Sequence, residues 1–249
     1  MSDTAEFTVT RDEGASIAVF TITRPARANA LSHAVLDGLI GTLRALPEHC
    51  RGVLLDSDGP VFSAGADLGC VKGNCADARP VQDLIDELVD TIESAPFPVA
   101  AFLDGKVVGA AVEVVSSCDI RLATPRAVLR IPATEIGTIY RPAGLENLSR
   151  RLPFVALQSM LLLGNTVSAG LAESWGLVEQ VPDRTAAVAA LTGKLTRLSQ
   201  RPGSFAAQKA SLTAVAHAIR LPEETRQIIA EIRNEFAGPA GPLVRLSSL

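Results

Sequence analysis

Apolar and polar residues alternate along the first part of the chain in patterns that predict strands and helices in turn. Residues 7–25, FTVTRDEGASIAVFTITRP, alternate on both sides of a Glu-Gly turn and predict a β-hairpin. Residues 52–57 and 97–105 are short apolar runs typical of strands that are buried on both faces. Helical spacing follows Ser32, a good N-cap, and returns over residues 81–95. Strands separated by helices indicate βαβ crossovers.

From residue 150 onward the pattern changes, and we expect helices alone. The predicted helical segments are 153–164, 168–176, 183–200, 203–219 and 222–236. The fold class is therefore α/β, with a core over residues 1–180 and a C-terminal helical region over residues 181–249. Residues 69–80, GCVKGNCADARP, are polar and contain glycine, so they predict a mobile loop.

Composition and charge narrow the classes of partner. The 23 basic and 27 acidic residues give a net charge of −4, which argues against nucleic acid as a partner. The four cysteines lack a CxxC pair and the three histidines are scattered, so we expect reduced thiols and no metal site. The N-terminus lacks the pattern of a signal peptide, and no apolar run approaches membrane-spanning length. We therefore expect a soluble, cytoplasmic protein with no membrane partner.

Two segments combine an apolar strand, a turn of small residues and the start of a helix. In residues 59–69, GPVFSAGADLG, Gly65 and the alanines beside it leave backbone N–H groups unshielded. In residues 103–120, Gly109 and Ala110 lead into a helix whose first N–H groups carry partial positive charge. Two such donors aimed at one point form an oxyanion hole. The alternative is that the small residues only allow close packing of helices on the sheet.

Glu113 is the only charged residue between Val107 and Cys118, in a segment that predicts a buried helix. Burial raises the pKa of a carboxyl group, which suits an acid or base that works near neutral pH. The alternative is a glutamate at a solvent-reaching edge of the helix or in a structural ion pair.

Five sequence segments occur in an order that is typical of one known family. They are TRPARANALS, FSAGADL, DGKVVGAAVEVVSSCDI, IPATEIGTIY and SAGLAESWGLVEQV. Together, from about residue 8 to residue 180, they resemble the crotonase superfamily of acyl-CoA enzymes, the enoyl-CoA hydratase/isomerase family. The resemblance implies a ββα spiral core and C-terminal helices that build a homotrimer or a dimer of trimers. It also implies an acyl-CoA thioester as the ligand and no cofactor, because coenzyme A enters as part of the substrate.

The resemblance assigns roles to individual residues. In the family the thioester oxygen lies between two backbone N–H groups, which correspond here to those of Ala66 and Ala110. A second set of residues would bind substrate along the coenzyme A path, largely through backbone contacts: Arg27, Ala64, Asp67, Leu68 and Gly109. Arg27 stands one position later than the family's usual basic residue.

One catalytic residue of the hydratases is missing. Enoyl-CoA hydratases use two glutamates to activate one water, and Glu113 matches the first. The second normally follows the proline of a PE pair, where this chain has Ala133. Glu135 lies two residues further on, where the alternation of a strand would place it on the same face. The missing glutamate argues against ordinary double-bond isomerisation.

Tyr140 is the only tyrosine in the chain and stands where the hydratases have a proline. The methylmalonyl-CoA decarboxylase branch of the superfamily is similar at this turn, since it has a tyrosine there, a glutamate matching Glu113 and no second catalytic glutamate. That branch differs in carrying a histidine where Ala66 stands. The alternative for Tyr140 is a loop aromatic whose hydroxyl bonds to the backbone.

The resemblance therefore implies a cofactor-free acyl-CoA lyase that decarboxylates a malonyl-CoA-type substrate. Ala66 and Ala110 would stabilise the thioester enolate through their N–H groups. Tyr140 would orient the leaving carboxylate, and Glu113 would position water or relay the proton that quenches the enolate. Two alternatives stay open: an enoyl-CoA hydratase/isomerase-type enzyme that uses Glu113, and a subunit that binds acyl-CoA without turnover.

Overall fold

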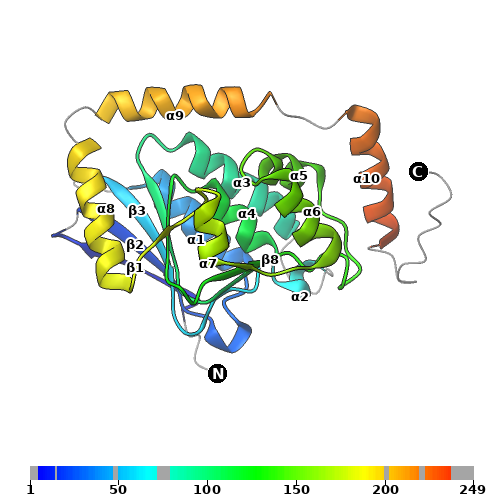
Figure 1. Cartoon of the computed structure of the whole chain (residues 1–249), viewed down its shortest axis with the longest axis horizontal. Helices are drawn as coiled ribbons and strands as arrows, with labels where there is room; N and C mark the ends of the chain where they lie inside the picture. The colour runs from blue at the N-terminus through cyan, green and yellow to red at the C-terminus, as the bar shows by residue number, and fades with distance from the viewer. Residues whose placement is uncertain are drawn as a thin grey trace.

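The chain folds into two β-sheets with helices packed on them (Figure 1). The computed structural model describes residues 5–14, 16–46, 50–71, 79–198, 202–218 and 222–236. The larger sheet has six strands in the order β1-β2-β3-β5-β7-β10; β1 and β2 are antiparallel and the other neighbours are parallel. Its strands are β1 (Phe7–Asp12), β2 (Ile17–Ile22), β3 (Gly52–Ser57), β5 (Val99–Leu103), β7 (Ile120–Ala123) and β10 (Glu179–Gln180).

The smaller sheet has four strands in the order β4-β6-β8-β9. These are β4 (Val61–Ser63), β6 (Lys106–Val108), β8 (Val128–Arg130) and β9 (Val167–Ser168). β4, β6 and β8 run parallel, and β9 is antiparallel to β8. Because parallel strands end at the same edge of a sheet, the segments that follow β4 and β6 begin side by side.

Helices bury both faces of the larger sheet. They are α1 (His33–Arg44), α2 (Leu68–Val71), α3 (Val81–Ser94), α4 (Ala110–Ser117), α5 (Pro142–Ser149), α6 (Phe154–Leu163), α7 (Ala169–Ser174), α8 (Arg184–Leu198), α9 (Pro202–Ala216) and α10 (Glu223–Phe236), with a short 3-10 helix at Pro25–Arg27. Along β2, Ala18, Phe20 and Ile22 belong to the cluster that contains the apolar faces of α1 and α3. Ile17 and Val19 pack in the cluster of α8 instead. The central strands are therefore buried on both sides.

Most of the predicted elements of the N-terminal half are confirmed. The hairpin is β1 and β2, and the apolar run at 52–57 is β3. The helix predicted after Ser32 is α1, and the Ser32 hydroxyl caps it by accepting a hydrogen bond from the Val35 N–H (3.2 Å). The sequence pattern identified β2, β3 and α1 through their regularly placed apolar residues, which the fold buries.

Three expectations need correction. The section after residue 150 is not helical throughout, since it also contains β9 and β10, which are too short to show a period of two. Gly69–Val71 belong to α2 rather than to a loop, and residues 72–78 lie outside the described residues. Cys70 is disulfide-bonded, whereas Cys50 and Cys118 are free thiols. Sequence spacing alone does not show which sulfur atoms the fold brings within bonding distance.

The C-terminal helices are fastened to the core by ion pairs. Figure 1 shows α9 running along one edge of the molecule and α10 beyond it. α9 contacts α3, and its Lys209 lies 2.7 Å from Asp119. α10 contacts α5, and its Arg226 pairs with Glu146. None of the helices in the described part of the chain is both long and apolar enough to cross a membrane.

Gly65 brings the segment after β4 against the segment after β6. Its φ angle is +85°, in the region that favours glycine. A Cβ atom added at Gly65 would lie 2.5 Å from Val108 O and 3.0 Å from Ala110 N. No side chain fits at these distances, so glycine is required for the close approach of the two backbones.

Replacing Gly65 should therefore destabilise the protein. We expect Gly65→Ala to lower the free energy of unfolding by roughly 1–3 kcal/mol, because alanine is strained at positive φ and its Cβ meets backbone atoms. Gly41→Ala is the matched control, since Gly41 is exposed on α1 and an added Cβ there meets nothing within 4 Å. The control should be stabilised by about 0.5–1 kcal/mol. Denaturant unfolding gives the free energy of unfolding of both variants. Equal unfolding midpoints for Gly65→Ala and Gly41→Ala would contradict this account.

Candidate active site

The amide of Ala66 lies on an extended segment that follows β4. The Leu31 N–H donates to the Gly65 carbonyl (2.8 Å), and the Asp67 N–H donates to the Leu31 carbonyl (3.1 Å). Because N–H groups alternate in direction along an extended chain, the Ala66 N–H points away from Leu31, to the side where β6 pairs with β4. This N–H donates to no acceptor within the described residues.

The amide of Ala110 is the first of α4. The Gly109 N–H donates to the Arg130 carbonyl (2.9 Å), and the Val112 N–H donates to the Gly109 carbonyl (3.0 Å). The Ala110 N–H lies between these two and has no acceptor in the part of the chain that the structure describes, as is usual in a first helical turn. Since Gly65 lies against Ala110, two free N–H groups start from adjacent backbones. This arrangement can hold one oxygen anion.

Glu113 lies one helical turn after Ala110 and is buried as expected, with an exposed fraction of 1%. Its Oε1 atom accepts a hydrogen bond from Nη2 of Arg141 (2.8 Å). Its Oε2 atom is buried and has no hydrogen-bond partner among the described residues. Burial raises the pKa of Glu113, although the Arg141 guanidinium opposes the increase, and the Asp86 carboxylate adds to it.

Arg141 bridges two carboxylates. Besides Glu113, it binds Asp86 of α3, with Nε at 2.6 Å and Nη2 at 2.5 Å from Oδ1. Burial acts to lower the pKa of Arg141, but the carboxylates of Glu113 and Asp86 outweigh burial and the pKa is raised. The guanidinium is therefore a permanent positive charge beside the buried glutamate.

Tyr140 lies beside the free oxygen of Glu113. A Cβ atom added at Gly144 would lie 2.9 Å from Glu113 Oε2 and 2.9 Å from Tyr140 Cδ1, so both groups approach α5 where it lacks a side chain. The tyrosine as a whole is partly exposed, but its hydroxyl is buried and unbonded within the described residues. Burial raises the pKa of Tyr140, and the Glu113 carboxylate adds to the increase, so the hydroxyl keeps its proton. Glu113 Oε2 and the ring of Tyr140, whose hydroxyl is a donor without a partner, thus border the same point of α5.

Of the residues expected along the coenzyme A path, some are exposed and one is held by contacts within the chain. Ala64 and Leu68 are exposed, while the Ala64 N–H donates to the Ala28 carbonyl (2.9 Å). The Asp67 carboxylate accepts from Arg24 (3.2 Å) and from the Gly69 N–H (3.0 Å), so it is held inside the chain. Arg27 ends the short 3-10 helix and is exposed. Its side chain is therefore accessible to an anionic group.

The replacement of the missing glutamate by Glu135 finds no support in the geometry. Residues 133–137 form turns instead of the strand on which the expectation rested, so Ala133 is buried and Glu135 is exposed. The Glu135 carboxylate pairs with Arg130 (2.5 Å). A Cβ atom added at Gly164 would overlap Glu135 Oε1, which places the carboxylate beside that glycine. It is engaged with these groups rather than with Glu113.

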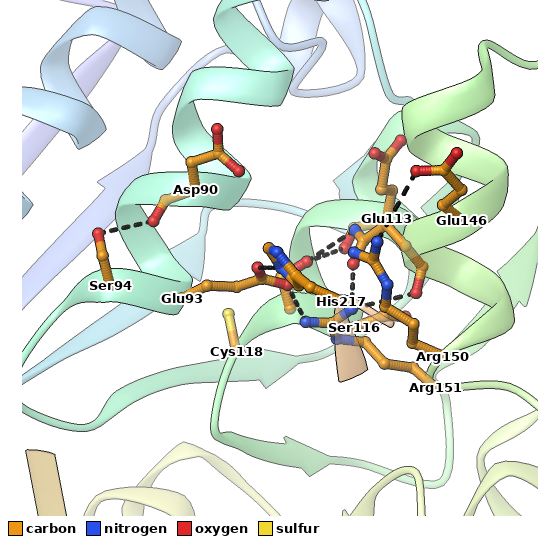
Figure 2. A network of polar contacts seen from close by, with 12 residues as sticks. Asp90, Glu93, Ser94, Glu113, Ser116, Cys118, Glu146, Arg150, Arg151 and His217 are labelled. Atoms are coloured by element: carbon orange, nitrogen blue, oxygen red, sulfur yellow. Dashed lines mark hydrogen bonds and ion pairs between the residues drawn. The ribbon is translucent and has the colours of Figure 1, made fainter. Parts of the chain in front are cut away.

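A second network of polar contacts begins next to Glu113 and extends to His217, the residue that follows α9 (Figure 2). The Ser117 hydroxyl donates to the Glu113 carbonyl (2.9 Å) and accepts from Asn147 Nδ2 (2.9 Å). Arg151 binds both Asn147 and the carboxylate of Glu93, and His217 Nε2 lies 2.6 Å from the other Glu93 oxygen. This chain of contacts links α4 to α5, to Glu93 of α3 and to the residue that follows α9.

Sequence reasoning missed three residues that shape the site. Arg141 and Asp86 are the charged partners of Glu113, and Gly144 makes room for Glu113 and Tyr140. One signal pointed to the first of them, because a buried carboxylate requires a cation and Arg141 directly follows the unusual tyrosine. In the described residues no group of three His, Cys, Asp or Glu side chains is placed to hold a metal ion.

Comparisons with known proteins identify the family to which this chain belongs. The sequence profile of the enoyl-CoA hydratase/isomerase family matches residues 12–236. The Bacillus subtilis (strain 168) protein YngF, named as an enoyl-CoA hydratase/isomerase, is 32% identical over 185 residues, which cover 73% of this chain and 70% of YngF.

Solved structures share the fold. A methylmalonyl-CoA decarboxylase in complex with 2-nitronate-propionyl-CoA superposes with a TM-score of 0.81 at 22% identity, over 93% of this chain and 90% of that one. A protein of Mycobacterium avium paratuberculosis K-10, named as an enoyl-CoA hydratase, has a TM-score of 0.79 at 28% identity, over 94% and 92% of the two chains. This chain therefore belongs to the enoyl-CoA hydratase/isomerase family, within the crotonase superfamily that its motifs resemble.

Proposed function

We propose that this protein is an acyl-CoA lyase that decarboxylates a malonyl-CoA-type thioester. The observation that carries the proposal is the pair of buried groups without partners, the Tyr140 hydroxyl and Glu113 Oε2. Buried polar atoms are nearly always hydrogen-bonded, so two without partners, on residues that both border Gly144, are suited to receive a polar ligand. The substrate carboxylate would accept a hydrogen bond from the Tyr140 hydroxyl.

The proposed reaction breaks the bond between the α-carbon and the carboxylate. Carbon dioxide leaves, and the electron pair passes into the thioester as an enolate whose oxygen becomes negative. The N–H groups of Ala66 and Ala110 would stabilise that oxygen, and each donor contributes roughly 2.7–4 kcal/mol in such a site. A proton delivered through Glu113 then forms the new C–H bond at the α-carbon. No metal or cofactor takes part in this scheme.

The chemistry of the site favours this reaction over water addition. Hydration requires one group that takes a proton from water and one that gives a proton to the α-carbon. Ala133 supplies no such group, and Glu135 is paired with Arg130. Decarboxylation needs only one proton, so a single carboxyl group is sufficient.

Hydration by Glu113 alone is the second candidate. Two observations favour it. The chain is similar in sequence to YngF, which is named as an enoyl-CoA hydratase/isomerase. The pKa of Glu113 is raised, which suits an acid as well as a base. A water held between Glu113 Oε2 and the Tyr140 hydroxyl would be the nucleophile.

A product screen separates these candidates. The purified protein is incubated with malonyl-, methylmalonyl- and enoyl-CoA thioesters, and the products are identified by mass spectrometry. Loss of carbon dioxide from a malonyl-type thioester supports the proposal, and hydration without decarboxylation contradicts it. Calorimetric binding of acyl-CoA without any product would instead indicate a binding subunit.

Tyr140→Phe should impair decarboxylation far more than binding. The substitution removes one hydroxyl and keeps the ring, so the shape of the site stays nearly constant. Loss of a hydrogen bond to a charged group costs about 1.5–3 kcal/mol, which corresponds to a fall in kcat of roughly ten- to hundredfold. Steady-state kinetics give the rate, and calorimetry with a non-reacting acyl-CoA gives the affinity as an internal control. An unchanged kcat would remove Tyr140 from the mechanism.

We also infer that the protein assembles as a homotrimer or a dimer of trimers. The support is the apolar surface of α6, where Phe154, Val155, Leu162 and Leu163 are all exposed. Leu212 on α9 is exposed as well. Contiguous exposed apolar side chains on one helix are typical of an interface between proteins.

Substituting Val155 should weaken this assembly. The side chain is 76% exposed in the isolated chain, so Val155→Asp removes little internal contact and acts mainly where another copy covers α6. Sedimentation velocity at micromolar concentration should show an oligomer for the parent protein and smaller species for the variant. Val9→Asp, the same substitution on the exposed side of β1, is the control and should leave the oligomer intact. A monomeric parent protein would refute the inference.

A further inference from the structure

Glu113, Arg141 and Asp86 form a ladder of alternating charges that runs from the site towards solvent. The Glu113 carboxyl is buried, and the Arg141 side chain is 11% exposed. Asp86 is 38% exposed and lines an open groove of about 760 Å³ along α3. The three groups come from separate elements, α4, the N-cap of α5 and α3. Only the outermost of the three is solvated.

The charge of this ladder depends on the protonation of Glu113. With Glu113 ionised, two carboxylates face one guanidinium and the ladder carries one net negative charge. A substrate that brings its own carboxylate to Tyr140 would then be repelled. With Glu113 protonated the ladder is neutral, and the proton resides on Oε2 because Oε1 accepts the hydrogen bond from Arg141. The protonated form is the one compatible with an anionic substrate.

We propose that Arg141 and Asp86 are positioning residues that act through Glu113: Arg141 stabilises the carboxylate that Glu113 becomes after giving up its proton, and Asp86 limits that stabilisation. This inference rests on the proposed function, because it assigns Glu113 as the proton donor to the enolate. In the step, the O–H bond at Oε2 breaks and the enolate electron pair forms the C–H bond at the α-carbon. Glu113 is left as a carboxylate beside Arg141, and solvent restores its proton.

Arg141 and Asp86 change the pKa of Glu113 in opposite directions. The titratable groups that face it are Asp86 from α3, Tyr140 from the preceding turn and Arg141 at the start of α5; the Asn147 amide adds a polar contact. Arg141 acts to lower the pKa of Glu113, and Asp86 acts to raise it. These opposite directions follow from the opposite charges of the two partners. The pH dependence of catalysis is therefore needed to separate a role in the reaction from a role limited to holding the fold together.

The test is a pH titration of Glu113 in the full-length protein. Infrared difference spectra follow its carboxyl band without substrate, and Glu113→Gln identifies the band. We expect Asp86→Asn to shift the titration of Glu113 to lower pH and Arg141→Gln to shift it to higher pH. Arg141→Lys keeps the charge and should lie between the parent protein and Arg141→Gln. Asp83→Asn, an exposed acid one turn earlier on α3, is the matched control and should leave the titration in place.

Kinetics supply the second readout. If protonated Glu113 is the active form, kcat for decarboxylation falls about tenfold per pH unit above its pKa, and the fall begins at lower pH in Asp86→Asn. Two outcomes would overturn the inference even if decarboxylation is intact. One is an equal shift of the Glu113 titration in Asp86→Asn and Asp83→Asn. The other is a shift in the same direction in the Asp86 and Arg141 variants. If the Glu113 titration shifts in opposite directions in the two variants but no decarboxylation is detected, Arg141 and Asp86 do act on Glu113 and the proposed function is wrong. Asp86→Asn carries the test if Arg141→Gln fails to fold, because Asp86 is partly solvated.

Discussion

The structure around the site depends on one constraint, the burial of a carboxyl group in a helix that has no other charged residue. Desolvating an unpaired ion costs several kcal/mol, and removing one partner of a buried pair costs about 3–5 kcal/mol. Glu113 meets the constraint with Arg141, which has no capping hydrogen bond of its own at the start of α5. A cation at a helix N-terminus is unfavourable for that helix, so the ion pair explains the position of Arg141 better than helix formation does. The pair thereby fixes α5 against α4.

Backbone geometry supplies the rest of the proposed chemistry. The two free N–H groups belong to alanines, whose side chains contribute no polar atom. What places them is the parallel pairing of β4 with β6 and the glycine that follows β4. Such a site tolerates changes in side chains as long as the two backbones stay in contact. This property is consistent with a fold shared by the decarboxylase and by the protein named as an enoyl-CoA hydratase, both of which superpose on this chain.

Local patterns predicted what local physics determines. Ser32 and the apolar spacing after it fixed the start of α1, and the apolar run at 52–57 marked β3. The burial of Glu113 followed from the absence of other charges around it. The hydrogen bonds of Arg141 could not be predicted in this way. Its two partners, Glu113 and Asp86, precede it by 28 and 55 positions in the chain, and no local pattern encodes contacts over such separations. Glu135 was misplaced for the opposite reason, because a period of two was assumed where the chain turns.

The ladder and the missing glutamate have a common consequence for the proposed chemistry. A site with two free carboxylates can both take a proton from water and return one, but it concentrates negative charge where a malonyl-type substrate would place its own. Here Ala133 removes one carboxylate, and Arg130 holds Glu135 at the surface. With Glu113 protonated, the remaining pair of Arg141 and Asp86 carries no net charge. The site thus lacks the second acid-base group that hydration uses, and the negative charge that would repel an anionic substrate is reduced. These changes favour the same reaction, in which the substrate supplies the leaving group and the protein supplies one proton.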